Sequence, residues 1–254
     1  METLKSQELE NCQEVDNSDD TQIEVSGRGQ YLYVYGIILL EDLKSQKSKT
    51  SESKKSEVKE DIFKFSFNGL REKPITIIPY KDIGVLISKY PFLNPILKEQ
   101  EAMKHADILK KIAKKTTIIP MAFGNVFRDK EVLGLILKKS YNVIKETLEQ
   151  IENKIELGVK VIKNNREENS IENEDNIIVE ILNPLNKLST KTIQGENFSE
   201  RLLLNHSFLV EKNNFSKFSN AIAKLEEKYK QLKFNYTGPW PPYSFVDIHI
   251  RGQK

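Results

Sequence analysis

The sequence predicts an α+β protein of two domains, in which the second domain is a ferredoxin-like β-α-β-β-α-β sandwich and a C-terminal tail packs between the domains. Short runs rich in aromatic and β-branched residues, bounded by polar segments, favour strands. Two longer stretches, in which apolar residues recur every three or four positions, favour amphipathic helices. Read in order from residue 116 to residue 238, these segments give the split βαβ order of a ferredoxin-like domain. Residues 29–115 give several strands and one helix, and therefore a smaller α+β domain.

The amino-acid composition argues against several classes of protein. The chain has 254 residues, of which 39 are basic and 37 acidic, so it lacks the basic footprint of a nucleic-acid binder. The longest apolar run, from Tyr31 to Leu40, is too short to span a bilayer, and the first residues do not resemble a secretion signal. A lone cysteine, Cys12, excludes internal disulfides and fits a reducing cytosol. We therefore expect a cytoplasmic protein that binds neither nucleic acid nor membrane.

The N-terminal domain is predicted to begin with a buried strand. Residues 1–28 are polar, acidic and aperiodic, which is typical of a disordered tail. The run from Tyr31 to Leu40 is almost wholly apolar, which favours a central strand buried on both faces. Residues 41–60 are rich in Lys, Ser and Glu and predict a flexible insertion. Three more strands are expected, at residues 63–67, 75–80 and 83–88, the last two joined by a tight turn at Lys81-Asp82.

A helix is predicted after Pro95, where the apolar period changes from two to nearly four. One face of this helix carries the apolar side chains of Ala102, Ala106, Leu109 and Ala113. His105 projects from the same apolar side. A single histidine in this setting is more often a satisfied core or domain-contact residue than a ligand, and both alternatives stay open.

The predicted second domain, residues 116–238, starts with a strand at 116–127, in which Pro120 and Gly124 mark an edge or a bulge. Asp129 is expected to cap a long helix, with an acidic residue in its first turn. The remaining elements are a helix over 133–155, a strand at 157–162, a linker at 164–176, strands at 177–182 and 202–210, a helix over 215–232 and a last strand at 234–236. Each helix would then cover one face of an antiparallel sheet.

The stretch after this domain, residues 239–254, is predicted to be a docking tail. Gly238 can take a positive φ without strain, so it is expected to be the pivot where the last strand ends. Three prolines stiffen the segment that follows: Pro239, Pro241 and Pro242. Three aromatic side chains on it are candidate anchors: Trp240, Tyr243 and Phe245. They either seal the protein's own core, which is the commoner use of large aromatics, or bind a partner.

No catalytic or cofactor-binding pattern is present in the sequence. Three scattered histidines and one cysteine cannot supply the ligand cluster of a zinc site. The chain has no Gly-x-Ser-x-Gly elbow and no P-loop, and Gly27-Arg28-Gly29 lacks the third glycine of a dinucleotide loop. The carboxylates lie in charge runs, for which a solvated helix face is the ordinary explanation. We therefore expect a protein that is not an enzyme and has no cofactor.

Several stretches together resemble the gas vesicle protein GvpF/GvpL family. The tail Gly238-Pro239-Trp240-Pro241-Pro242-Tyr243-Ser244-Phe245-Val246 is similar to the family's terminal signature. The other similar stretches follow in order: Tyr33-Val34-Tyr35-Gly36-Ile37 (opening strand), His105 with Ile108-Leu109 (histidine helix), Ile119-Pro120-Met121 with Phe123-Gly124 (Pro-x-x-Phe-Gly strand), Gly158-Val159-Lys160-Val161, and Leu204-Asn205 with Phe208-Leu209-Val210. The resemblance covers residues 31 to 246.

The chain also departs from the family pattern. Ala122 stands where the family usually has Arg, Asn125 where it has Thr, and Leu157 where it has Trp. The helical extension that the family usually carries in its second domain is reduced to the linker at residues 164–176. If that extension contacts partners, this protein has lost or moved the contact.

The resemblance implies a non-enzymatic accessory or minor structural protein that is needed for gas vesicle assembly. Gas vesicles are gas-filled shells built mainly from a small, very apolar subunit, whose exposed apolar surface and unpaired strand edges invite misassembly. The implied partners are this shell subunit and other gas vesicle accessory proteins, and the implied location is the gas vesicle in the cytoplasm. The tail would lock the two domains in one orientation, with Trp240 as its main anchor.

Two other functions fit parts of the sequence. A ferredoxin-like small-molecule enzyme or regulator would use His105, because that fold hosts many unrelated functions. A bound cofactor, or a deep polar pocket around His105, would favour this alternative. RNA binding on an open sheet face is disfavoured by the near-neutral charge and by the lack of an aromatic and basic strand pattern.

Overall fold

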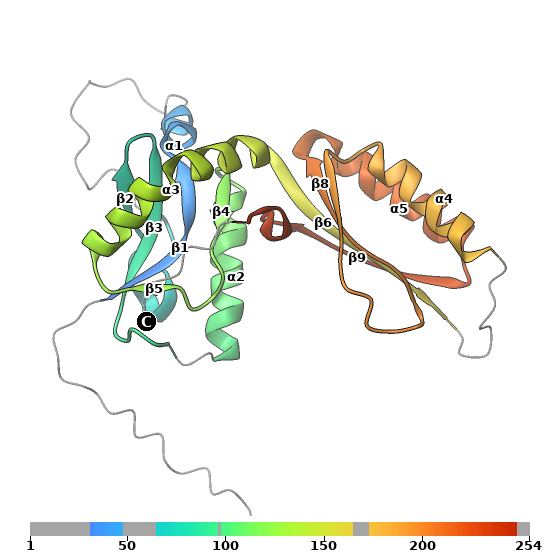
Figure 1. Ribbon diagram of the computed structural model, residues 1–254, viewed down its shortest axis with the longest axis horizontal. Coiled ribbons are helices and arrows are strands. Elements are labelled where there is room, and N and C mark those ends of the chain that lie inside the picture. Colours follow the sequence, from blue (N-terminus) through green and yellow to red (C-terminus); the bar gives the residue numbers. More distant parts are fainter. Residues whose placement is uncertain (1–30, 48–64, 96–97, 165–172, 248–254) are drawn as a thin grey trace, which may run out of the picture.

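The computed structural model describes residues 31–47, 65–95, 98–164 and 173–247, which form two α+β units joined by one short connection (Figure 1). The predicted disordered tail at 1–28 lies outside these ranges, as do most of the predicted insertion and most of the predicted linker. Within these ranges, none of the helices combines the length and the apolar character that a membrane span requires.

The first unit, residues 31–151, is built on an antiparallel sheet. Its strands are β1 (Tyr31–Leu39), β2 (Thr76–Tyr80), β3 (Ile83–Tyr90), β4 (Ile118–Pro120) and β5 (Val126–Phe127). Their order is β2-β3-β1-β4, with β5 paired to the other end of β1. The predicted tight turn between β2 and β3 is confirmed, and Lys81 takes the positive φ of 53° that such a turn demands.

Strand β1 is buried on both faces, as its apolar sequence predicts. One face packs against helix α3 (Lys130–Ile151) through Val34 and Ile37. The opposite face packs against helix α2 (Glu99–Ala113) through Tyr33 and Tyr35. A β-bulge between Val34 and Gly36 shifts the alternation of side chains by one residue at this point. The first unit is therefore one sheet between two helical layers.

Two predictions for the start of the first unit are wrong. The predicted flexible insertion at 41–60 begins as helix α1 (Leu40–Lys47). The strand predicted at 63–67 does not form over its described residues, and only an isolated bridge follows, between Asn68 and Pro74. Phe65 and Phe67 instead lean against the core on the α2 side of the sheet, beside the 3-10 helix η1 (Leu70–Glu72).

The predicted boundary of the second domain at residue 116 is also wrong. Strands β4 and β5 pair with β1, and the apolar side of α3, including Leu137 and Ile144, is buried in the core of the first unit. Periodicity shows that a helix has an apolar face, but it does not show which sheet that face covers. The boundary lies instead between α3 and the next strand, at residues 152–153.

The second unit has the element order β-α-β-β-α-β over residues 154–240. Its elements are β6 (Lys154–Lys163), α4 (Glu174–Asn186), β7 (Lys191–Gln194), β8 (Leu202–Glu211), α5 (Phe215–Lys228) and β9 (Leu232–Trp240). The sheet order is β7-β8-β6-β9, and every pairing is antiparallel. Both helices pack on one face of this sheet, against side chains such as Val159 and Phe208.

Helix α4 replaces the strand predicted at 177–182. That apolar run is rich in isoleucine, which favours a strand locally, but its buried side chains, Ile181 and Leu185, lie four residues apart. The strand between α4 and β8 is β7, which the sequence analysis did not predict. The long predicted helix over 133–155 ends at Ile151, and Ile155 belongs to β6.

Candidate functional site

The candidate site is the junction between the two units, which is crossed by the C-terminal arm (residues 238–247). The φ of Gly238 is +120°, and a Cβ at this position would lie 2.8 Å from the backbone oxygen of Glu156, so only glycine fits. The strand does not end at Gly238 as predicted. Gly238 and Pro239 form a bulge, and pairing with β6 resumes where Trp240 lies opposite Glu156.

Trp240 faces helix α2 of the first unit. The ammonium nitrogen of Lys110 lies 4.1 Å from the centre of its ring, a distance at which the cation and the aromatic face attract each other. Trp240 also lines a groove of about 490 Å³ between the units, together with Pro239 and Pro241. The only tryptophan of the chain is therefore half-buried at the junction and in contact with both units.

The arm is held to the second unit by Glu156, a carboxylate that is only 8% exposed. One oxygen accepts a hydrogen bond from the backbone N–H of Ser244 at 2.8 Å. The other accepts from the hydroxyls of Ser244 at 2.6 Å and Ser207 at 3.0 Å. A carboxylate can be buried only with such donors, so these three contacts fix the arm over β6 and β8.

The arm reaches the first unit through its last apolar residues. Pro241, Pro242 and Phe245 are buried, and Val246 packs against the α3-side core of the first unit. Figure 1 shows the short 3-10 helix of the arm, η3 (Tyr243–Phe245), lying between the units next to α2 and β4. Tyr243 is 39% exposed and is not a buried anchor.

His105, on α2, lies in a buried polar cluster beneath the junction. The ring nitrogen Nε2 is 2.9 Å from the carbonyl oxygen of Met121, which can only accept, so Nε2 carries the proton. Nδ1 then accepts from the hydroxyl of Tyr33 at 2.8 Å. That hydroxyl in turn accepts from the backbone N–H of Gly124 at 3.2 Å. Both ring nitrogens are therefore engaged in a neutral imidazole.

The predicted site residues Phe123 and Gly124 belong to the same cluster. The ring of Phe123 lies 5.8 Å from the ring of His105, centre to centre. The φ of Gly124 is +93°, a conformation that favours glycine and that aims its N–H at Tyr33. The structure thus separates the predicted residues into two groups, the arm and the His105 cluster.

Burial sets the ionisation of this cluster. It lowers the pKa of His105 to about 4, although the hydrogen bond to the Met121 carbonyl acts in the opposite direction. Burial also raises the pKa of Tyr33 above its ordinary range, with a smaller contribution from the phenol of Tyr243. Near neutral pH the imidazole of His105 is therefore neutral and the phenol of Tyr33 keeps its proton.

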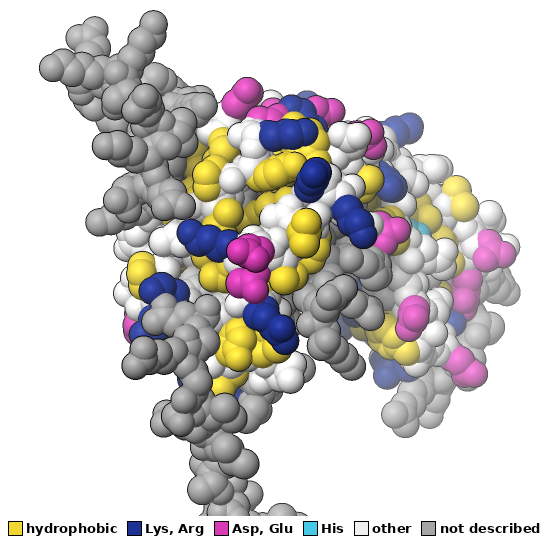
Figure 2. All heavy atoms as spheres, turned by 60° about the vertical axis from the view of Figure 1, so that its left-hand side comes forward, with side chains coloured by type: hydrophobic (Ala, Val, Ile, Leu, Met, Phe, Trp, Pro, Cys, Tyr) yellow, Lys and Arg dark blue, Asp and Glu magenta, His cyan; other side chains and the backbone are white. Residues whose placement is uncertain are grey.

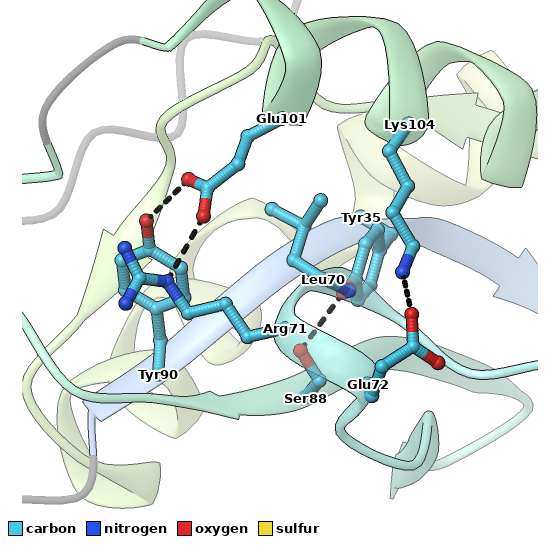
Figure 3. Close-up of polar contacts among 8 residues, drawn as sticks. All are labelled: Tyr35, Leu70, Arg71, Glu72, Ser88, Tyr90, Glu101 and Lys104. Atoms are coloured by element: carbon cyan, nitrogen blue, oxygen red, sulfur yellow. Dashed lines mark hydrogen bonds and ion pairs between the residues drawn. The ribbon is translucent and has the colours of Figure 1, made fainter.

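A second polar network ties α2 to η1 and β3 (Figure 3). Glu101 accepts from the hydroxyl of Tyr90 and from Nε of Arg71, each at 2.9 Å. Glu72 pairs with Lys104 one turn further along α2. The hydroxyl of Tyr35 accepts from the Leu70 N–H at 2.7 Å and bonds to Ser88. This network holds α2, and with it Lys110, in place.

The sequence analysis missed most residues of the junction. Glu156 carried little signal, because it lies just before the strand predicted at 157–162 and near several charged residues. The lysine that contacts Trp240 carried no signal, since Lys110 is 130 positions away in a chain with many lysines. Among the described residues, no group of three or more His, Cys, Asp or Glu side chains is placed to hold a metal ion.

Comparisons with known proteins agree over most of the chain. The family model described as gas vesicle synthesis protein GvpL/GvpF matches residues 31–179 and 162–247. Gas vesicle protein F1 of Halobacterium salinarum is 29% identical over 226 residues, covering 88% of this chain and 96% of the relative. Gas vesicle protein F of Haloferax mediterranei is 28% identical over 223 residues, covering 86% and 94%.

Solved structures show the same fold. The crystal structure of GvpF from Anabaena superposes with a TM-score of 0.70 at 17% identity, over 87% of this chain and all of that one. GvpF from Microcystis aeruginosa gives a TM-score of 0.70 at 15% identity, over 86% of this chain and 99% of that one. The described chain therefore has the same overall fold as these two structures.

Proposed function

The chain belongs to the GvpL/GvpF family of gas vesicle synthesis proteins, and from this membership we propose that it is an accessory or minor structural protein needed for gas vesicle assembly. In this proposal it acts at the gas vesicle in the cytoplasm, by binding the shell subunit or other accessory proteins rather than by catalysis. The observation that carries the proposal is the arm, which contacts both units and so makes them one binding body.

Exposed apolar side chains support a binding role. Leu135 and Val143, on the outer side of α3, are 66% and 53% exposed. Figure 2 shows hydrophobic side chains gathered on a face of the first unit, with both basic and acidic side chains between them. Such a surface suits an apolar partner, because it offers apolar contact within a charged and soluble rim.

We infer further that the second unit is a ferredoxin-like sandwich. Its sheet order, β7-β8-β6-β9, its antiparallel pairings and its two helices on one face support this inference. The predicted order is thus kept, but over residues 154–240 instead of 116–238.

The alternative function, a small-molecule enzyme or regulator that uses His105, has less support. His105 is only 2% exposed, and the two nitrogens of its ring are hydrogen-bonded to the Tyr33 hydroxyl and the Met121 carbonyl. A general base needs a lone pair that a substrate can reach. Turnover by the purified protein, or a cofactor visible by absorbance, would favour this alternative.

The variant Trp240→Ala tests the proposed function. We expect a lower melting temperature and a loss of gas vesicle formation in a cell that depends on this protein, because the variant removes the contact with Lys110 and opens the junction. Phe198→Ala is the matched control, since this aromatic side chain is 70% exposed. Unchanged melting together with intact vesicles in Trp240→Ala would refute the role of the arm.

A pull-down tests the partners separately. The tagged protein, isolated from a cell that forms gas vesicles, is expected to retain the shell subunit or another gas vesicle protein. Trp240→Ala is expected to reduce this capture and Phe198→Ala to leave it unchanged. Capture of neither class of protein by the wild type would contradict the proposed partners.

A further inference from the structure

The groove at the junction is lined by lysines and by apolar side chains. Its volume of about 490 Å³ is that of a small ligand pocket. Three of its lining residues are lysines that come from both units: Lys110 on α2, Lys114 directly after α2, and Lys212 after β8. None of the described residues that line it is acidic.

The walls of the groove are flat and apolar. They are formed by Trp240, Pro239, Phe215 and Ile155, among others. Aromatic and proline rings are already rigid, so an apolar side chain can pack against them at a small cost in conformational entropy. The walls therefore favour a hydrophobic or aromatic side chain as the occupant.

The charges favour a carboxylate beside that side chain. The ammonium of Lys110 lies above Trp240, and that of Lys212 donates to the carbonyl oxygen of Ala113 at 3.3 Å, at the end of α2. Lys110 also has Asp107 at 3.8 Å, but the Asp107 side chain is 65% exposed, which weakens that pair. Three lysines that line one apolar groove are complementary to an anion that is attached to an apolar group.

We propose that this groove binds a short segment of a partner protein in which an Asp or Glu lies next to apolar or aromatic side chains. The inference rests on the proposed function, because it assumes that the chain works by binding other proteins. Lysines offer point charges on long stems without a fixed fork, which suits a variable peptide better than a small ligand whose polar groups must be matched.

Intrinsic fluorescence gives a direct test, because Trp240 is the only tryptophan of the chain and lines the groove. The probes are short tryptophan-free overlapping peptides that cover the shell subunit and the other gas vesicle proteins of the same cell. We expect saturable changes in emission from peptides that combine acidic and apolar residues. Replacing their Asp and Glu by Asn and Gln should weaken binding about tenfold, and added salt should weaken it too.

Variants of the lysines complete the test. Lys110→Gln with Lys114→Gln should weaken peptide binding about tenfold, whereas Lys224→Gln with Lys230→Gln, two exposed lysines of the second unit, should not change it. Equal binding of the acidic and amide peptides, no binding by any peptide, or tighter binding of a small carboxylate such as decanoate would overturn the proposal. Unchanged peptide binding by the lysine variants would also overturn the proposal for the groove, and loss of vesicles in Trp240→Ala would then still support the function of the arm. Weaker peptide binding by the lysine variants with intact vesicles would support the groove and show that vesicle formation does not need it.

Discussion

At the scale of single residues, His105 shows how burial fixes a protonation state. Its pKa is lowered to about 4 from an ordinary value of 6.5, because the charged imidazolium would lose its water in the core. The unfolded chain therefore takes up a proton first as the pH falls. The contribution of His105 to stability is fully present above pH 6.5 and is lost as the pH falls towards 4.

The first prediction follows from this difference. Between pH 6.5 and pH 5.5, protonation of His105 in the unfolded chain should cost about 1 kcal/mol of folding free energy. Urea unfolding at both pH values measures it. His105→Gln should remove this part of the pH dependence, since an amide can still donate to Met121 and accept from Tyr33. Equal pH dependence in the variant and the wild type would contradict a buried neutral imidazole.

Sequence reasoning goes only part of the way at this scale. It placed His105 on the apolar side of a helix and favoured a satisfied core residue over a ligand, which the geometry supports. It could not name Tyr33 as the partner, because the two residues are 72 positions apart. Glu156 was missed for the same reason, since its partner Ser244 is 88 positions away.

At the scale of elements, the start of α3 was predicted correctly. The side chain of Asp129 accepts from the backbone N–H of Val132 at 2.8 Å, as expected of an N-cap. A helix cap can be predicted from the sequence because its donor and acceptor are only three residues apart. The strand predicted at 177–182 was wrong, because this segment is helix α4 and packs its buried side chains, Ile181 and Leu185, against the sheet near β8.

The second prediction concerns this cap. Asp129→Ala should lower the free energy of unfolding by about 1 kcal/mol, because an N–H of the first turn of α3 loses its acceptor. Asp129→Asn, which keeps an acceptor oxygen, should retain most of the stability. Chemical denaturation of the three proteins at pH 7.5 measures the difference. An alanine variant as stable as the wild type would show that the cap is not needed.

The third prediction concerns the arm as an element. Glu156→Ala leaves the N–H of Ser244 without its acceptor and should cost about 2 kcal/mol. Hydrogen exchange should then speed up at Ser244 and Phe245, because the arm opens locally before the units unfold. Glu149→Ala, an exposed position on α3, is the control. Unchanged exchange at Ser244 would mean that other contacts hold the arm.

At the scale of the whole molecule, the sequence predicted two units and an arm between them, but it divided the chain in the wrong place. The reason is physical: β4 and β5 together contribute five residues, and their membership of a sheet is decided by pairing with β1, far earlier in the chain. Helix α3 belongs to the first unit because it packs on the sheet of that unit. Long-range pairing of this kind leaves no local pattern, whereas the arm is visible because proline, glycine and tryptophan are rare in the rest of the chain.

The last prediction concerns the coupling between the units. The second unit has a core separate from the two core clusters of the first, and contacts between the described parts of the units include the arm, Lys110 with Trp240 and Lys212 with the end of α2. Units with separate cores unfold together only if the contacts between them are worth enough free energy. We therefore expect the wild type to unfold in one calorimetric transition, because the arm buries Phe245 and packs Val246 on the first core.

Removing these arm contacts should split that transition. Phe245→Ala with Val246→Ala should weaken the coupling by about 3 kcal/mol and give two transitions, one for each unit. Phe198→Ala, on an exposed loop of the second unit, should keep a single one. A double variant that still unfolds in one transition at the wild-type temperature would show that the connection after α3 is sufficient. The two units would then unfold together without the contacts of the arm, and the remaining role for Trp240 would be in the groove.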